Sequence, residues 1–300
     1  MSPDFWVILT GILAASACGL IGSFLVLRQS AMLGDAISHA VLPGLVLGFL
    51  VTSSRAVIPM VIGAAIMGIL TAFLTEFLSR SGRLYRDSSL GIVFTTLFSL
   101  GVILIAAFAG QVDLDQECVL YGEIAYTPWD TFILSGTNLG PRSVWILGAI
   151  FIINVLFITI FYKQLKITSF DPQLAKTVGI SDRLWHYLLT GIVSLTVVAS
   201  FESVGAILVV AMLIVPGATA FLLTRRLWLM LVLSVVFGVI SAVGGYLGAS
   251  VTNTSIAGFM AVAGGFVFAI IIVLKSAMDR NKRLVAKPSD QLNPIQATLS

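Results

Sequence analysis

The chain has 300 residues, of which 58% are hydrophobic and only 10% are charged, and its formal net charge at pH 7 is +3. Its mean hydropathy is +1.05. Because soluble domains carry about 25% charged residues, this composition excludes a soluble globular domain and predicts an integral membrane protein.

Apolar runs of about 20 residues, long enough to cross a bilayer as helices, recur along most of the chain. We expect about eight or nine spans, and therefore an all-α, polytopic transmembrane helix bundle. The candidate segments are residues 5–27, 32–52, 57–78, 89–109, 142–162, 184–201, 203–223, 227–250 and 255–274. The apolar stretch 184–223 can form two spans or one broken arrangement. No linker interrupts the segments, so residues 1–276 are predicted to form a single transmembrane domain.

The first segment follows MSPDFWVILTG, which has no basic region before its apolar stretch. A cleaved signal peptide is therefore not expected, and the segment should remain as a span. Cys18 and Cys118 lie far apart in different settings, which predicts neither a metal motif nor a disulfide framework.

The second segment contains two ionisable residues four positions apart, in GDAISHAVLPG (residues 34–44). On a helix Asp35 and His39 share a face, and carboxylate and imidazole groups both bind metal ions. An ionisable residue at membrane depth is costly and by default marks a functional site such as an ion pathway. The pair therefore predicts a metal site, and the structural alternative is a hydrogen-bonded pair that fixes helix packing.

The loop between the fourth and fifth segments, GQVDLDQECVLYGEIAYTPWD (residues 110–130), is acidic and has no Lys or Arg. Its acidic residues are Asp113, Asp115, Glu117, Glu123 and Asp130. Acidic groups around a vestibule raise the local concentration of cations and speed their arrival. We predict an outer acidic loop of Asp113, Asp115, Glu117 and Glu123 that attracts metal ions, and the alternative is an ordinary solvated loop.

The segment SFDPQLAKTVGISDR (residues 169–183) predicts a short helix between two loops. Asp171 suits its N-cap, Pro172 its first turn and Gly179 its C-terminal stop. Phe170, Leu174 and Val178 are spaced at i, i+4 and i+8, an apolar face suited to docking in a groove on a soluble partner. The alternative is an amphipathic helix on the lipid surface.

Three other ionisable residues lie near apolar segments. Glu76 can form a local ion pair with Arg80, four residues later. His186, beside Trp185, is interpreted as a residue of the membrane interface rather than a ligand. Glu202 is flanked by apolar residues on both sides. It is either an acidic residue buried deep in the membrane or a simple loop glutamate.

The distribution of basic residues predicts the orientation, because cytoplasmic loops are enriched in Lys and Arg. With the N-terminus outside, 15 of the 17 Lys and Arg residues fall on the inside, and only Arg55 and Arg142 do not. The C-terminus is then cytoplasmic, and residues 277–300, which are polar and contain two prolines, are expected to form a disordered tail.

The chain is not expected to hydrolyse ATP. A P-loop has the sequence GxxxxGK[ST], and none of the six lysines follows a glycine. Energy must come from a separate ATP-binding subunit or from an ion gradient.

In this order, GDAISHAVLPG, FDPQLAKTVGI and SVGAILVVAMLIVPGATA resemble the membrane permease subunits of bacterial ABC importers for manganese, zinc and iron. The resemblance covers nearly all of residues 5–275. It implies that Asp35 and His39, with Glu202, lie on the metal path. It also implies that residues 170–180 form the helix that couples the permease to its ATPase, a segment that includes Phe170, Asp171, Pro172, Leu174, Ala175, Val178 and Gly179. A site near the membrane midplane would require the second span to start deeper or to be broken.

The sequence thus predicts a permease subunit that moves a divalent transition metal inward across the bacterial cytoplasmic membrane. Ser38, Pro43 and Gly44 favour the manganese and iron members, so Mn²⁺ comes before Fe²⁺ or Zn²⁺, and the absence of a paired thiolate motif argues against Cu⁺. No permanently bound cofactor and no nucleic acid is expected. Expected partners are a cytoplasmic ATP-binding subunit, an extracytoplasmic metal-binding protein and a second permease subunit, identical or related. The alternatives are a proton-coupled metal carrier and a non-transporting membrane scaffold.

Overall fold

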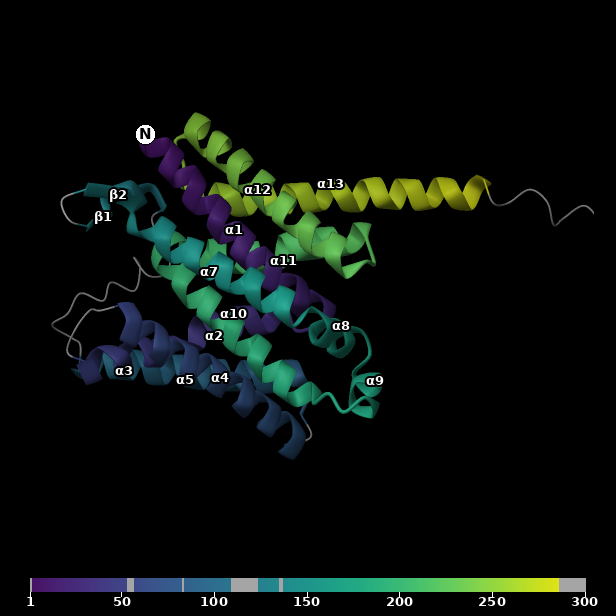
Figure 1. Cartoon of the computed structure of the whole chain (residues 1–300), viewed down its shortest axis with the longest axis horizontal. Helices are drawn as coiled ribbons and strands as arrows, with labels where there is room; N and C mark the ends of the chain where they lie inside the picture. Colours follow the sequence, from purple (N-terminus) through teal and green to yellow (C-terminus); the bar gives the residue numbers. More distant parts are fainter. Residues whose placement is uncertain (1, 53–56, 83, 109–123, 135–136, 286–300) are drawn as a thin grey trace, which may run out of the picture.

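The structure, a computed structural model, describes residues 2–52, 57–82, 84–108, 124–134 and 137–285 (Figure 1). Its elements are α1 (Pro3–Leu27), α2 (Met32–Ala40), α3 (Leu42–Thr52), α4 (Val57–Ser81), α5 (Arg86–Phe108), η1 (Ile124–Trp129), β1 (Thr131–Leu134), β2 (Thr137–Pro141), α7 (Arg142–Ile160), α8 (Tyr162–Phe170), α9 (Pro172–Thr177), α10 (Asp182–Val204), α11 (Ala206–Leu223), α12 (Leu227–Thr252) and α13 (Ile256–Val285).

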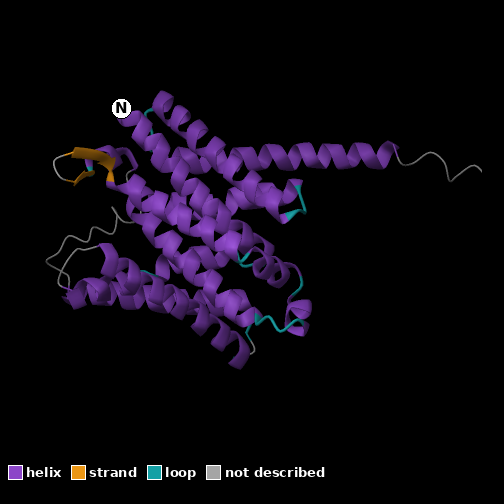
Figure 2. Ribbon diagram, in the orientation of Figure 1, coloured by secondary structure: helices purple, strands orange, loops and turns teal. Residues whose placement is uncertain are grey.

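The predicted all-α membrane bundle is confirmed. Within the described residues, nine helical segments are long and apolar enough to cross a membrane, each overlapping one of the predicted segments. The chain is therefore a multi-pass membrane protein. A small antiparallel hairpin, β1 and β2, lies at the same end as the N-terminus (Figure 2). The sequence did not predict it, because its strands are too short to show an alternating pattern.

Helix α1 forms the centre of the larger group of helices and packs against α7, α10, α11 and α12. Its residues from Ala14 to Leu25 are all buried. Small residues allow this close approach, since a Cβ at Gly22 would overlap the backbone carbonyl of Leu213 in α11. Asn154 of α7 adds a buried polar connection, because its Nδ2 donates to the carbonyl of Ala17 at 3.2 Å and to Thr196 Oγ1 of α10 at 3.0 Å.

The second span is broken into α2 and α3, which meet at Val41. Pro43 explains the break, because it has no N–H to donate to the carbonyl of His39 four residues earlier. Helices α2 to α5 form a second group, in which α3 packs against α4 and α5, and α2 packs against α4 and α5. The two groups meet mainly where α4 packs against α10 and where α2 packs against α10 and α11.

The stretch 184–223 forms two spans, α10 and α11. They meet at Gly205, whose φ of 78° is strained for a residue with a side chain.

At the C-terminus, α13 continues to Val285 and extends beyond the bundle (Figure 1). The disordered tail expected from residue 277 is therefore wrong for residues 277–285, which continue the helix, and residues 286–300 lie outside the described residues.

The close approach of α1 and α11 predicts a specific stability effect. Gly22→Ala places a methyl group against the Leu213 carbonyl, which belongs to a helix backbone and cannot rotate away. Overpacking of this kind costs roughly 1–3 kcal/mol, so the thermal unfolding midpoint in detergent should fall. Gly148→Ala on α7 is the matched control, because nothing outside its own helix lies within 4 Å of the added Cβ. Equal midpoints for the two variants would contradict the packing described above.

Candidate metal site

Asp35 and His39 lie on one face of α2, as the sequence predicted. The distance from His39 Nε2 to Asp35 Oδ1 is 3.7 Å, too long for a hydrogen bond. Two metal–ligand bonds of about 2.1 Å each can span this separation, so a divalent cation fits between the two atoms. The neighbouring Ser38 hydroxyl donates to the carbonyl of Asp35 within the same helical turn.

Two aromatic rings of α5 surround the imidazole of His39. The Phe98 ring lies 5.8 Å away, edge to face at 88°, and the Phe94 ring lies 6.0 Å away at 32°. These rings restrict the rotation of His39 and cover one side of the pair. The sequence did not identify them, because two phenylalanines in an apolar segment carry no local signal of a contact with another helix.

The pair lies near the middle of the bundle along its length. Ile37, between Asp35 and His39, packs beside Gly68 near the midpoint of α4, where an added Cβ would lie 3.5 Å from Ile37 Cγ2. The side chain of Ser194, near the midpoint of α10, also lies beside Gly68. The second span is thus broken, and Ile37 of α2 lies level with the midpoints of α4 and α10.

In the single chain the site is partly open. The side chain of Asp35 is 45% exposed and that of His39 is 36% exposed. No group of three or more His, Cys, Asp or Glu side chains that could hold a metal ion is present in the described part of the chain. The described part of the chain therefore brings together two candidate ligands, Asp35 and His39.

Other predicted site residues are not tested by this geometry. Glu202 lies in the last turn of α10, but its side chain is not among those described, so its assignment as a ligand stays a prediction. The acidic loop residues Asp113, Asp115, Glu117 and Glu123 lie outside the described residues.

The short helix predicted near residue 172 is α9, and its capping is as expected. The Asp171 carboxylate accepts from the backbone N–H groups of Gln173 and Leu174 at 3.1 and 2.9 Å. Gly179, with a φ of 79°, ends the segment, and the N–H of Ile180 returns to the carbonyl of Ala175 at 2.8 Å.

The expected i, i+4, i+8 apolar face is wrong in one respect. Helix α9 covers only Pro172–Thr177, and Phe170 is the last residue of α8, a helix that the sequence did not predict. The two helices are separated by Asp171 in a more extended conformation. Phe170, Leu174 and Val178 are nevertheless exposed, at 50%, 49% and 63%, whereas Ala175 is buried. The segment therefore presents three apolar side chains to its surroundings, although one helix does not carry all three.

Glu76 contacts a different helix in addition to any local interaction. Its Oε2 accepts a hydrogen bond from Tyr187 Oη of α10 at 2.6 Å, and its Oε1 lies 3.8 Å from Arg183 Nε. The sequence suggested only a pair with Arg80, because spacing within one helix cannot predict partners more than 100 residues away. His186 lines a cavity beside this contact.

Comparison with known proteins gives consistent results. The manganese transport system membrane protein MntD of Bacillus subtilis (strain 168) is 51% identical over 277 residues, which are 92% of this chain and 94% of that protein. The zinc transport system membrane protein TroD of Treponema pallidum (strain Nichols) is 41% identical over 265 residues, which are 88% of this chain and 72% of that protein.

The fold is also found in a solved structure. A chain of PsaBC from Streptococcus pneumoniae in complex with Fab matches with a TM-score of 0.75 and 32% identity, covering 90% of this chain and 91% of that one. The model of the ABC 3 transport family matches residues 4–275. This match, together with the identity to full-length relatives, establishes that the chain belongs to the ABC 3 transport family.

Proposed function

We propose that this chain is the membrane permease of an ATP-driven importer for a divalent transition metal, with Mn²⁺ as the first candidate and Fe²⁺ or Zn²⁺ as the others. The observation that carries the proposal is the Asp35 and His39 pair, held on one helix face near the middle of the bundle. A cation crossing the membrane needs ligands at this depth, and ionisable side chains there are costly and by default mark a functional site.

The chemistry of the pair suits all three metals, because carboxylate and imidazole ligands bind each of them. Preference for Mn²⁺ rests on the 51% identical relative, whose name specifies manganese. The more distant relative at 41% identity is named for zinc. Ligand type alone does not distinguish the two ions.

Coupling to ATP hydrolysis is assigned to α9. The end of the bundle that carries α9 also carries the free end of α13, and the N-terminus lies at the opposite end (Figure 1). Basic residues concentrate at the α9 end, which favours a cytoplasmic location for it. Because this chain has no P-loop sequence, the exposed Phe170, Leu174 and Val178 side chains are proposed to dock on a separate ATP-binding subunit.

A second permease subunit is proposed to cover the metal site. Two ionisable side chains that are more than one-third exposed near the membrane midplane cannot face lipid without a large cost. A second copy of this chain, or a related permease, can close this face, supply further ligands and enclose a path for the ion. On the opposite side, the acidic loop is proposed to receive metal from an extracytoplasmic binding protein.

Removing either ligand of the pair tests the metal site. We expect Asp35→Asn and His39→Ala each to lower Mn²⁺ affinity and uptake by roughly 10–100-fold, the range found even for groups that only support metal ligands. Uptake is measured in proteoliposomes containing the assembled importer. Asp87→Asn, which changes an exposed carboxylate in the first turn of α5, should transport normally. Wild-type uptake by both site variants would refute the assignment.

A charge on the coupling segment tests the ATPase partner. Leu174→Asp introduces a carboxylate into an apolar contact, where burial without a partner costs several kcal/mol. The variant should lose its ATPase on purification from detergent but still bind Mn²⁺, since Asp35 and His39 lie on another helix. Gln173→Asp, which places the same charge one residue away, should retain most of the ATPase. Uptake driven by a proton gradient in the purified chain alone would instead identify a proton-coupled carrier.

A further inference from the structure

Helices α4 and α10 are in close contact at the middle of the bundle. Ser194 Oγ of α10 donates to the carbonyl of Ala64 at 3.2 Å, and a Cβ at Gly68 would overlap the Ser194 side chain. One turn along α10, a Cβ at Gly191 would lie 3.5 Å from Ile69. At this level the two helices pack closely, because glycines on both of them leave room for the Ser194 and Ile69 side chains.

Toward the α9 end the same two helices separate around a cavity of about 490 Å³. Its lining includes Glu76 and Ser79 of α4, Arg183 and His186 of α10, Lys176 of α9 and Leu33 of α2. Apolar packing cannot hold the helices together where a cavity lies between them. Polar side chains that reach across must provide the contact there.

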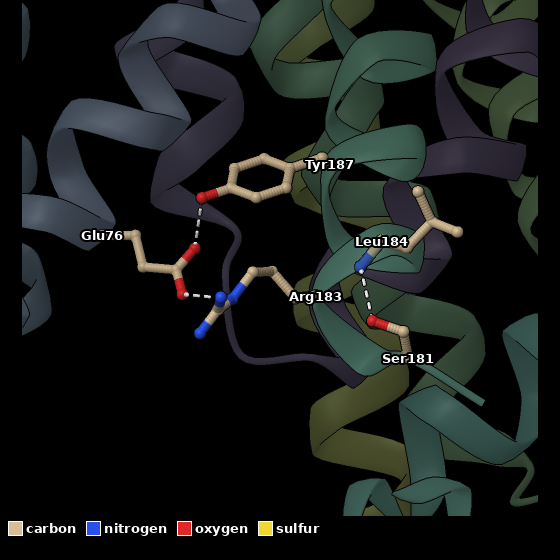
Figure 3. Close-up of polar contacts among 5 residues, drawn as sticks. All are labelled: Glu76, Ser181, Arg183, Leu184 and Tyr187. Carbon is tan, nitrogen blue, oxygen red and sulfur yellow. Dashed lines mark hydrogen bonds and ion pairs between the residues drawn. The ribbon is translucent and has the colours of Figure 1, made fainter. Parts of the chain in front are cut away.

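Figure 3 shows the side chains that make this contact. Tyr187 Oη donates to Glu76 Oε2 at 2.6 Å, a short hydrogen bond to a carboxylate and therefore among the stronger kinds. Arg183 Nε lies 3.8 Å from Glu76 Oε1, but the Arg183 side chain is 61% exposed, so this ion pair contributes less. Glu76 is 22% exposed and is the single acceptor that both α10 side chains share.

The α10 half of this contact is attached directly to α9. Only residues 178–181 separate the two helices, and the hydrogen bond from Ile180 N–H to the Ala175 carbonyl folds this connection back onto α9. Ser181 Oγ then accepts from the N–H of Leu184 at 3.4 Å and caps α10 (Figure 3). A displacement of α9 therefore moves the first turns of α10, which carry Arg183 and Tyr187.

The α4 half of the contact is attached to the metal pair. Glu76 lies two turns, about 12 Å, from Gly68, which packs beside Ile37 between Asp35 and His39. The cavity is lined by two basic side chains, Lys176 and Arg183, and by two acidic ones, Glu76 and Asp182, so its lining has no excess of negative charge that would attract a cation. A mechanical contact between the two helix groups is the simpler role for these side chains.

We propose that Glu76, Tyr187 and Arg183 form a latch that joins the α9 ends of α4 and α10, and that its opening and closing couples α9 to the metal pair. The close Gly68 and Ser194 contact acts as the pivot. This inference rests on the proposed function, since it assigns the latch a role in ATP-driven import. The three residues are positioning residues and do not touch the metal.

The test uses the assembled importer in proteoliposomes, with Mn²⁺ import and ATP hydrolysis measured in the same preparation. Glu76→Gln and Tyr187→Phe should each lower the number of Mn²⁺ ions imported per ATP hydrolysed by about tenfold, while ATP hydrolysis continues. A purely structural role would lower both rates together. Asp182→Asn is the matched control, because this carboxylate lines the same cavity beside Arg183 but is not one of the three latch residues. This variant should keep the wild-type ratio.

The double variant Glu76→Gln, Tyr187→Phe should lose far less than the product of the two single effects, because both changes act on the same hydrogen bond: the first removes the charge of its acceptor and the second removes its donor. A wild-type ratio in both single variants, or a roughly hundredfold loss in the double variant, would overturn the latch. If Glu76→Gln does not assemble, Tyr187→Phe, which keeps its ring, decides the question. A wild-type importer that moves no Mn²⁺, Fe²⁺ or Zn²⁺ would instead refute the proposed function.

Discussion

Two ionisable side chains in the middle of a membrane bundle impose the main constraint on this protein. Ionisable side chains are costly at membrane depth, so neighbouring groups must compensate for the loss of water around Asp35 and His39. Part of the compensation is within the chain, where the Phe94 and Phe98 rings of α5 hold the imidazole. The rest of the pair stays exposed in the single chain, at 45% for the Asp35 side chain and 36% for that of His39.

The break in the second span serves this constraint. A continuous helix would keep one direction along the whole second span. The break before Pro43 instead lets α2 and α3 adopt separate directions. The tightly packed helices around α1 form the rigid part of the bundle, against which α2 is placed. Its buried small residues let α11 and α12 approach so closely that the backbone itself forms the contact surface.

The contact between α4 and α10, which joins the two helix groups, changes in character along its length. Near the centre, α4 and α10 are in contact along small residues, and toward α9 they are bridged by polar side chains across a cavity. Close packing resists sliding, whereas a few hydrogen bonds can break and re-form at modest cost. Such an interface is suited to a rocking motion about its centre.

The sequence by itself determined the class of the protein, the positions of its spans and the pairing of Asp35 with His39. These features depend on hydrophobic length and on residues within one helical turn, which the local sequence specifies. It also predicted the caps of α9 correctly, because Asp171 and Gly179 act on backbone groups only a few residues away.

Only the tertiary structure decided which segments meet. It brought Phe94 and Phe98 to His39, joined Glu76 to Tyr187, and separated Phe170 from the helix that carries Leu174. The β-hairpin and the extension of α13 past residue 276 were likewise absent from the sequence prediction. Contacts between distant segments depend on how whole helices pack. In a membrane chain most apolar residues are equally suited to face lipid or protein, so hydrophobicity alone cannot select the buried face.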